Sequence, residues 1–140
     1  PKAKTTDWMH NRRILKNAMP EGIYEIFLLN AKGCIMEGLG SNFYAIFNDE
    51  LHTASEGVLP GIARQIVYQI APSILPVTNS PVHISELSHV TETFLTSSSR
   101  GIIPVIEIDN IPIGTGITGV ITKQLQDSYN QWVFEHLEEL

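Results

Sequence analysis

The sequence is poor in cysteine, in long apolar runs and in clusters of basic residues, which are features typical of several large protein classes. Only one of its 140 residues is a cysteine, Cys34, so the chain cannot form an internal disulfide and is compatible with a reducing compartment. No apolar run reaches the roughly 18 to 20 residues that a membrane-spanning helix needs. Acidic residues outnumber basic ones by 15 to 9, and no basic cluster exceeds the pair Arg12 and Arg13. This charge balance argues against a nucleic-acid binder.

What remains is the composition of an ordinary globular domain. Hydrophobic residues make up 43% of the chain and charged residues 17%, and the formal net charge is -6. The length suggests one domain with a single core, without repeats, linkers or low-complexity tracts. The abrupt start at Pro1, without an initiator methionine, a signal peptide or a transit segment, suggests a piece cut from a longer protein.

The hydrophobic periodicity predicts strands in the middle of the chain with helices around them. Helices are expected at residues 7–18, 61–71, 85–87 and 120–140, and strands at 23–29, 34–36, 42–47, 51–53, 82–84, 93–96, 102–108 and 111–113. The predicted core positions of the second and last helices are Ile62, Ile66, Val67, Ile70, Ile121, Leu125, Trp132, Val133 and Leu137. This order of elements predicts a mixed α/β or α+β domain.

Residues 114–119 read G-T-G-I-T-G, which matches the G-x-G-x-x-G pattern of dinucleotide-binding sites. Such a site needs a central strand before the glycines and a second strand ending in an acidic residue about 20 positions later. Here the preceding strand is short and contains Pro112, and no strand follows. We therefore expect a glycine-rich turn that leads into the last helix.

Other chemistry-bearing residues give weak signals when they are considered singly. The five histidines have no metal-ligand spacing with one another or with Cys34, so no metal site is predicted. The three serines at 97–99 are not inside a nucleophile elbow, and hydroxyl groups in a loop more often form turns or bind anions.

Three segments become more informative when they are taken together. Residues 59–64 open a helix whose first backbone N–H groups could bind a phosphate, although simple helix initiation explains them as well. Glu37, followed by Gly38 and Gly40, could hold a cationic group or be a solvated turn residue, and Lys4 could be an ordinary surface charge. A lysine, a carboxylate and an anion site are what pyridoxal 5'-phosphate requires, for its Schiff base, its pyridine nitrogen and its phosphate.

The residues of these segments, and their order along the chain, resemble those of the fold-type IV pyridoxal-phosphate enzymes, also called the class IV aminotransferase family. The resemblance runs from Lys4 to the final helix. Its motifs are K-T-T-D-W at 4–8, E-G-L-G-S-N-F at 37–43, L-P-G-I-A-R at 59–64, E-T-F-L-T-S-S at 92–98 followed by P-V at 104–105, and the glycine-rich loop at 114–122. Branched-chain aminotransferases, D-amino acid aminotransferases and aminodeoxychorismate lyases belong to this family.

The resemblance implies roles for individual residues. Lys4 would be the Schiff-base lysine and the proton carrier, and it is favoured over Lys2 because it has the family's distance to Asp7. Glu37 would bind the pyridine nitrogen of the cofactor, and Leu59 would pack on one face of its ring.

The same resemblance implies a phosphate site and a substrate side. Ile62 and Ala63 would bind the phosphate through their backbone N–H groups, and Ser98 would add its hydroxyl and a backbone contact. Ser97 or Ser99 would lie beside the substrate.

The chain departs from the family pattern at several positions. Ala63 stands where threonine is usual, so one hydroxyl that could bind the phosphate is absent, which corresponds to about 0.5 to 1.5 kcal/mol. The pairs at 7–8 and 119–120 also differ from the pattern. Arg100 follows the serines where a small residue is common, and it could meet a substrate carboxylate or be solvated. Arg64 is expected to brace Glu37 or a nearby loop.

The implied protein is the C-terminal cofactor-binding domain, residues 1–140, of a class IV aminotransferase, with a D-amino acid aminotransferase-like pseudo-barrel fold and an N-terminal domain that is absent from this chain. The implied reaction transfers an amino group from an amino acid to a 2-oxo acid in a cytoplasmic homodimer. A lyase that eliminates pyruvate from 4-amino-4-deoxychorismate, and an inactive cofactor-binding fragment, are the alternatives.

Overall fold

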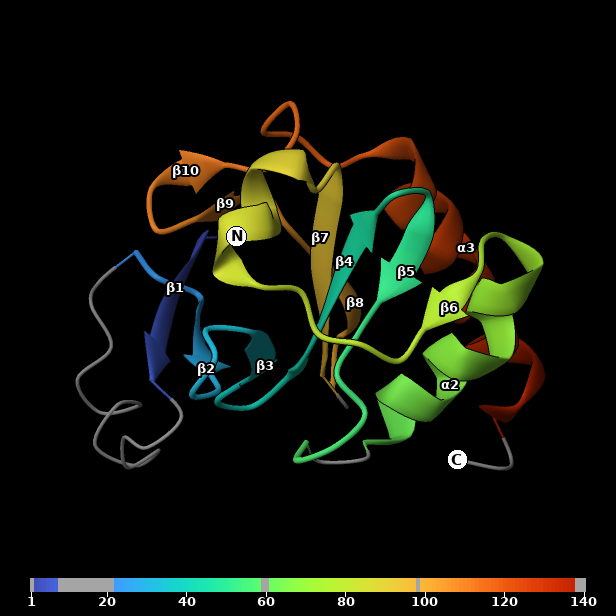
Figure 1. Cartoon of the computed structure of the whole chain (residues 1–140). Helices are drawn as coiled ribbons and strands as arrows, with labels where there is room; N and C mark the ends of the chain where they lie inside the picture. Colours follow the sequence, from blue (N-terminus) through green and yellow to red (C-terminus); the bar gives the residue numbers. More distant parts are fainter. Residues whose placement is uncertain (1, 8–21, 59–60, 98, 138–140) are drawn as a thin grey trace.

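The computed structural model describes residues 2–7, 22–58, 61–97 and 99–137 (Figure 1). Within these ranges strands dominate the chain. The elements are β1 (Lys2–Asp7), β2 (Glu25–Leu29), β3 (Ile35–Gly38), β4 (Asn42–Phe47), β5 (Glu50–His52), α2 (Ile62–Ile70), η1 (Ala71–Ser73), β6 (Val77–Thr78), η2 (Ile84–His89), β7 (Glu92–Ser97), β8 (Gly101–Val105), β9 (Glu107–Ile108), β10 (Ile111–Pro112) and α3 (Val120–Glu135).

The sheet closes on itself, which confirms the predicted pseudo-barrel. Strand β1 pairs in parallel with both β2 and β9. From β2 the antiparallel ladder continues through β3 and β4 to β7 and β8. Only Ile106 separates β8 from β9, so the ladder returns to β1 and the ring is complete. Helices α2 and α3 cover the outside of the ring near β4, β7 and β8 (Figure 1).

Two hairpin turns depend on residues that tolerate a left-handed backbone. Asn48 and Asp49 connect β4 to β5 with φ angles of 53° and 61°, and Asp109 and Asn110 connect β9 to β10 with 51° and 65°. Two consecutive positive φ angles are the geometry of the turn whose twist matches paired strands, and Asn and Asp are the non-glycine residues that adopt it most readily. The second of these turns joins β9 and β10, which lie within the predicted strands at 102–108 and 111–113.

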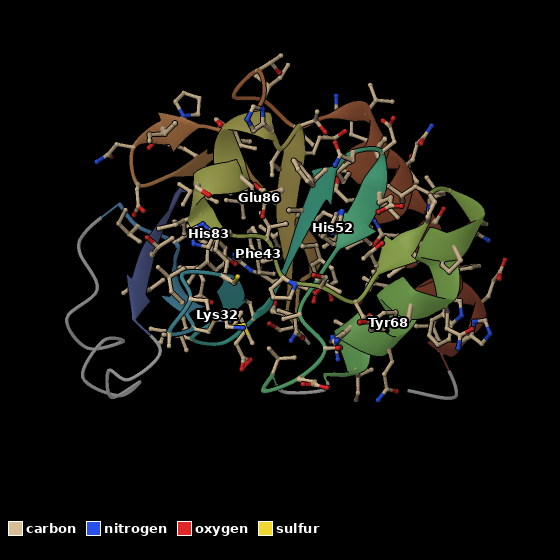
Figure 2. All side chains as sticks on the ribbon, in the orientation of Figure 1. Lys32, Phe43, His52, Tyr68, His83 and Glu86 are labelled. Atoms are coloured by element: carbon tan, nitrogen blue, oxygen red, sulfur yellow. The ribbon has the colours of Figure 1, made fainter. Side chains whose placement is uncertain are left out.

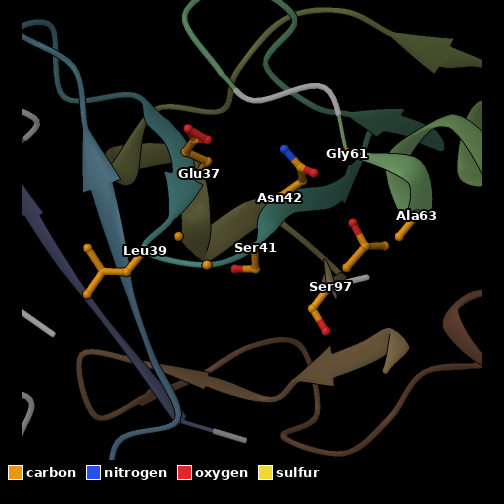
Figure 3. Close-up of a pocket in the computed structure, with 10 residues that line it drawn as sticks. Glu37, Leu39, Ser41, Asn42, Gly61, Ala63 and Ser97 are labelled. Carbon is orange, nitrogen blue, oxygen red and sulfur yellow. The ribbon is translucent and has the colours of Figure 1, made fainter. Parts of the chain in front are cut away.

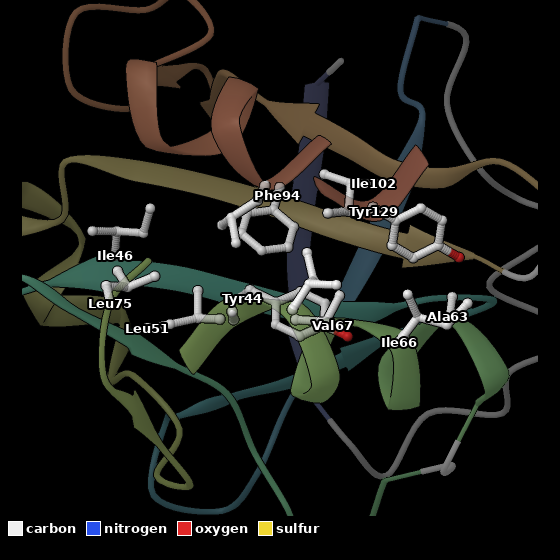
Figure 4. Packing of buried hydrophobic residues seen from close by; sticks show 13 residues of the cluster. Tyr44, Ile46, Leu51, Ala63, Ile66, Val67, Leu75, Phe94, Ile102 and Tyr129 are labelled. Carbon is white, nitrogen blue, oxygen red and sulfur yellow. The ribbon is translucent and has the colours of Figure 1, made fainter. Parts of the chain in front are cut away.

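The strands bury both faces, so the ring has one core inside and another beneath the helices. Phe27, Phe43 and Leu95 belong to the inner core, and their rings and methyl groups fill the barrel. Tyr44 and Phe94 point to the other face, where their rings stack at 4.6 Å (Figure 4). The outer core is completed by α2 and α3 through Ala63, Ile66, Val67, Ile70, Leu125 and Tyr129.

The structure differs from the sequence predictions at some of the elements. Residues 82–84 do not form a strand, because His83 caps the helix η2. The ring Nδ1 of His83 accepts from Ser85 N at 3.0 Å, and its backbone N–H donates to Glu86 Oε1 at 3.0 Å (Figure 2). Strand β1 was not predicted, because its residues carry no apolar run. The predicted helix at 7–18 lies outside the described residues, except for Asp7, which ends β1.

Two predicted core residues are exposed. Ile62 is 59% exposed, because Ala63 and Arg64 take the buried positions in the first turn of α2. Leu137 is 61% exposed because α3 ends at Glu135, so Leu137 is not on the helix face that packs on the core. No helix in the described ranges is both long and apolar enough to span a bilayer.

The glycine-rich segment is a turn, as predicted. Gly114 and Gly116 have φ angles of 58° and 78°, and Gly119 caps α3. The Glu92 carboxylate accepts from the backbone N–H of Thr122 at 2.7 Å and of Ile121 at 3.3 Å, and a side chain at Gly119 would overlap it. An internal carboxylate therefore occupies the helix start where a dinucleotide phosphate would have to bind.

We predict that Glu92→Ala lowers the free energy of unfolding by about 1–2 kcal/mol, because two helix N–H groups lose their acceptor. Urea denaturation measures this change. The matched control is Glu135→Ala at the exposed end of the same helix, which we expect to stay within about 0.5 kcal/mol. Equal effects of the two substitutions would contradict the capping role.

Candidate functional site

A pocket of about 230 Å³ lies where the β3–β4 turn, the start of α2 and the end of β7 meet (Figure 3). These segments are far apart in the sequence, and each was predicted separately to carry part of a site. The pocket is lined by Glu37, Gly38, Leu39, Gly40, Ser41, Asn42, Gly61, Ala63, Thr96 and Ser97. The fold therefore brings a carboxylate, a helix start and hydroxyl groups to one cavity.

Glu37 is the charged residue of this pocket. It lies in β3 opposite Leu28 of β2 and Asn42 of β4, and only 2% of its surface is exposed. Burying a carboxylate is costly unless hydrogen bonds or a positive charge compensate it. A buried carboxylate that lines a cavity is therefore suited to hold a protonated nitrogen of a bound molecule.

The register of the sheet relates Lys4 to Glu37. Lys4 is opposite Ile26 in β2, and Leu28, two residues further along β2, is opposite Glu37 in β3. Because residues two apart in a strand share a face, positions 4 and 37 belong to the same face of the sheet, with β2 between them. The side chain of Lys4 lies outside the described part of the structure, as do Leu59 and Ser98.

The start of α2 offers backbone N–H groups to the pocket. Gly61 caps the helix in an extended conformation without a side-chain hydrogen bond, and its carbonyl accepts from Gln65 N at 3.1 Å. The first N–H groups of a helix have no partner within the helix, and they carry the positive end of its dipole. Gly61 and Ala63 line the pocket, whereas the exposed Ile62 side chain faces elsewhere.

The predicted substrate residues are divided between two cavities. Ser97 lines the pocket that contains Glu37, whereas Ser99 and Arg100 line a neighbouring pocket of about 370 Å³. Arg100 Nη1 donates to the Tyr24 hydroxyl at 2.7 Å, and its guanidinium lies 5.6 Å from the centre of that ring. The structure thus brings Ser97 and Glu37 to one pocket and places Arg100 against Tyr24.

Arg64 braces a loop. Its Nη2 donates to the Ala54 carbonyl at 2.7 Å and to the Tyr68 hydroxyl at 2.6 Å, and the Tyr68 hydroxyl donates to Asn79 Oδ1 at 2.7 Å. The buried guanidinium thus ties the segment after β5 to α2. This fixes the helix that forms one wall of the pocket.

The sequence analysis missed Glu25, which holds another wall in place. Its buried carboxylate accepts from Gly40 N at 3.2 Å, Ser41 Oγ at 2.9 Å and Ile26 N at 2.9 Å. A Cβ at Gly38 would lie 2.7 Å from Glu25 Cδ, so the turn can close against Glu25 only with glycine there. An acid within the apolar run of β2 was the available signal.

Thr96 and Asn42 were also missed, and both are buried at the pocket. The Thr96 hydroxyl lies 2.9 Å from that of Tyr44, behind the pocket wall. Burial raises the pKa of Tyr44 far above its usual value, so its hydroxyl stays protonated. Across the described ranges, no cluster of His, Cys, Asp and Glu side chains is arranged to hold a metal ion.

We predict that Glu25→Ala lowers the free energy of unfolding by about 2–3 kcal/mol, because one buried and two partly buried hydrogen bonds lose their acceptor. Glu25→Gln keeps an acceptor oxygen and should cost less, about 1 kcal/mol. Urea denaturation measures both changes, and hydrogen exchange at the Gly40 amide reports the turn itself. Unchanged protection of that amide in Glu25→Ala would contradict this role of Glu25.

The chain is similar in sequence to known proteins. The model of the amino-transferase class IV family matches residues 1–108. A protein of Aquifex aeolicus named "Probable branched-chain-amino-acid aminotransferase" is 40% identical over 116 residues, which cover 80% of this chain and 37% of that protein. The D-alanine aminotransferase of Staphylococcus aureus is 31% identical over 105 residues, covering 73% of this chain and 37% of that protein.

The fold also has solved counterparts. The branched-chain amino acid aminotransferase of Escherichia coli superposes with a TM-score of 0.83 at 23% identity, covering 93% of this chain and 50% of that chain. Another branched-chain amino acid aminotransferase with the same TM-score of 0.83 and 23% identity was crystallised with pyridoxamine 5'-phosphate. At this identity the likeness shows the fold alone. The chain spans only 37% of each of the two curated relatives described above.

Proposed function

Because the chain belongs to the class IV aminotransferase family, we propose that it is the C-terminal, cofactor-binding part of a pyridoxal-phosphate-dependent aminotransferase. The whole protein would transfer an amino group from an amino acid to a 2-oxo acid. The observation that carries the proposal is the pocket itself, which combines the buried carboxylate of Glu37 with the open helix start at Gly61–Ala63 and the hydroxyl of Ser97.

The residues present fit pyridoxal 5'-phosphate. Glu37 would hold the pyridine nitrogen, and the backbone N–H groups of Ile62 and Ala63, together with Ser98, would hold the phosphate. Leu59 would pack on the ring. When bound, the cofactor supplies an electron-accepting ring that stabilises negative charge on the substrate Cα.

Glu37 has a defined electrostatic task in this proposal. Its carboxylate has little contact with water, so a positive partner stabilises it more strongly than it would at the surface. In return, the carboxylate keeps a proton on the nitrogen that faces it. The protonated ring then withdraws electrons more strongly from the substrate.

Lys4 would bind the cofactor covalently through its amine and then carry a proton to and from the substrate Cα. Support comes from the register, which assigns positions 4 and 37 to one face of the sheet. Ser97 would contact the substrate from the end of β7, and Ser99 and Arg100 would do so from the adjacent turn.

The finer parts of the proposal follow the family resemblance. The substrates are small amino acids and 2-oxo acids, and the whole protein is a cytoplasmic homodimer. The names of the relatives support transamination over elimination. Pyruvate released from 4-amino-4-deoxychorismate without a 2-oxo acid acceptor would instead establish the lyase.

We predict that borohydride reduction of the full-length protein with pyridoxal 5'-phosphate attaches a pyridoxyl group to Lys4, because only a covalent bond to the cofactor is fixed in this way. Peptide mass spectrometry locates the group. Lys4→Ala should lose the label, whereas the matched control Lys2→Ala should keep it. A label on any other lysine would overturn the assignment.

We also predict that Glu37→Gln keeps most of the cofactor affinity but slows transamination by about 100-fold, because a neutral amide cannot hold the proton on the ring nitrogen. Cofactor fluorescence and single-turnover kinetics measure the two quantities separately. Glu56→Gln, at an exposed position, is the control and should behave like the wild type. Unchanged turnover in Glu37→Gln would remove the proposed role.

A further inference from the structure

The wall of the pocket contains a pair of hydroxyl groups that none of the proposed cofactor contacts uses. Tyr44 in β4 and Thr96 in β7 are both fully buried, with 0% and 1% of their surfaces exposed. Their oxygens lie 2.9 Å apart, and either can be the donor. Thr96 lines the pocket and Tyr44 lies behind it, so the two hydroxyls form a short chain that ends at the cavity.

The number of hydrogens in this pair is informative. Each hydroxyl carries one hydrogen, and one of the two is used in the bond between them. In the described ranges neither hydroxyl has a second hydrogen-bond partner. One hydrogen therefore remains, and a buried donor without an acceptor is costly. Of the two groups, only Thr96 lines the pocket, where a bound molecule could accept that hydrogen.

The direction of the bond follows from chemistry. A phenol is a stronger donor than an aliphatic alcohol, and burial keeps the pKa of Tyr44 high enough for it to remain protonated. The ring of Tyr44 is held against Phe94 by stacking at 4.6 Å and 12°. These properties favour Tyr44 as the donor and Thr96 as the acceptor, which leaves the Thr96 hydrogen for the cavity.

A second threonine in the same strand has the opposite arrangement. Thr93 is equally buried, but it faces the inside of the barrel and donates to the Val105 carbonyl at 2.6 Å. Its hydroxyl is satisfied within the protein and needs no ligand. Thr96 has no such backbone acceptor in the described ranges.

We propose that Thr96 donates a hydrogen bond to the phosphate group of the bound cofactor, with Tyr44 as the positioning residue that orients it. This inference rests on the proposed function and adds a binding residue to it. Ala63 lines the same cavity at the position where the family pattern has threonine. The Thr96 hydroxyl, supported by Tyr44, supplies the hydroxyl contact that Ala63 cannot make.

The test compares two ligands that differ only in the phosphate. Dissociation constants for pyridoxal 5'-phosphate and pyridoxal are measured on the full-length protein by fluorescence. Thr96→Val removes the hydroxyl but keeps the branched shape, and it should weaken pyridoxal 5'-phosphate binding about tenfold or more, the size expected for a hydrogen bond to a charged group. Pyridoxal binding should stay within about twofold, as expected where no partner is lost. Thr93→Val is the matched control and should leave the ratio of the two constants unchanged.

Further variants keep the test decisive. Thr96→Ser retains the hydroxyl and should preserve the wild-type ratio, and Thr96→Ala should repeat the loss if Thr96→Val does not fold. Tyr44→Phe should weaken pyridoxal 5'-phosphate binding less than Thr96→Val, and the double variant should be no worse than Thr96→Val alone. If Thr96→Val and Thr96→Ala affect both ligands equally or neither, the inference is wrong. If the wild-type protein fails to bind pyridoxal 5'-phosphate, the proposed function itself fails.

Discussion

The whole molecule depends on one constraint: the central strands of the closed ring must bury both of their faces. One face fills the barrel, and the other is covered by α2 and α3. This is why β2 is apolar after Glu25 and has every residue buried, instead of alternating between apolar and polar residues. In such strands a buried polar side chain is costly, so the few that are present indicate a position where a requirement other than apolar packing selects the residue. Glu37, Asn42 and Thr96 are three of them, and they occupy adjacent strands on the same face.

The position of the site follows from where α2, which covers the outer face of the sheet, begins. Helix α2 starts beside the ends of β4 and β7, so the cavity has polar strand residues on one side and, on the other, helix N–H groups that have no partner within the helix. One wall is fixed by Glu25 and the helix wall by Arg64, each through a buried charged side chain that forms hydrogen bonds to neighbouring segments. Rigid walls of this kind suit a site that binds a charged ring and a phosphate in a defined orientation.

Much of the fold could be predicted from the sequence where local chemistry decides it. Strand β4 has its predicted bounds, and α2 differs by one residue at each end, because both carry a clear apolar pattern. Strand β1 could not be predicted, since its place is set by pairing with two distant strands and not by its own residues. Glu37 and the helix start were recognisable from their motifs. The role of Thr96 was not, because it depends on the register between β4 and β7, and a shift of one residue would turn its side chain into the barrel.

Ala63 has a consequence for how this site could change during evolution. Among the described residues, it alone lines both the pocket of Glu37 and the pocket of Arg100. The walls of the two cavities therefore share this residue, which also packs in the outer core. A larger side chain at this position would change the surroundings of both cavities, so a substitution there links the anion-binding end of the first pocket to the shape of the second.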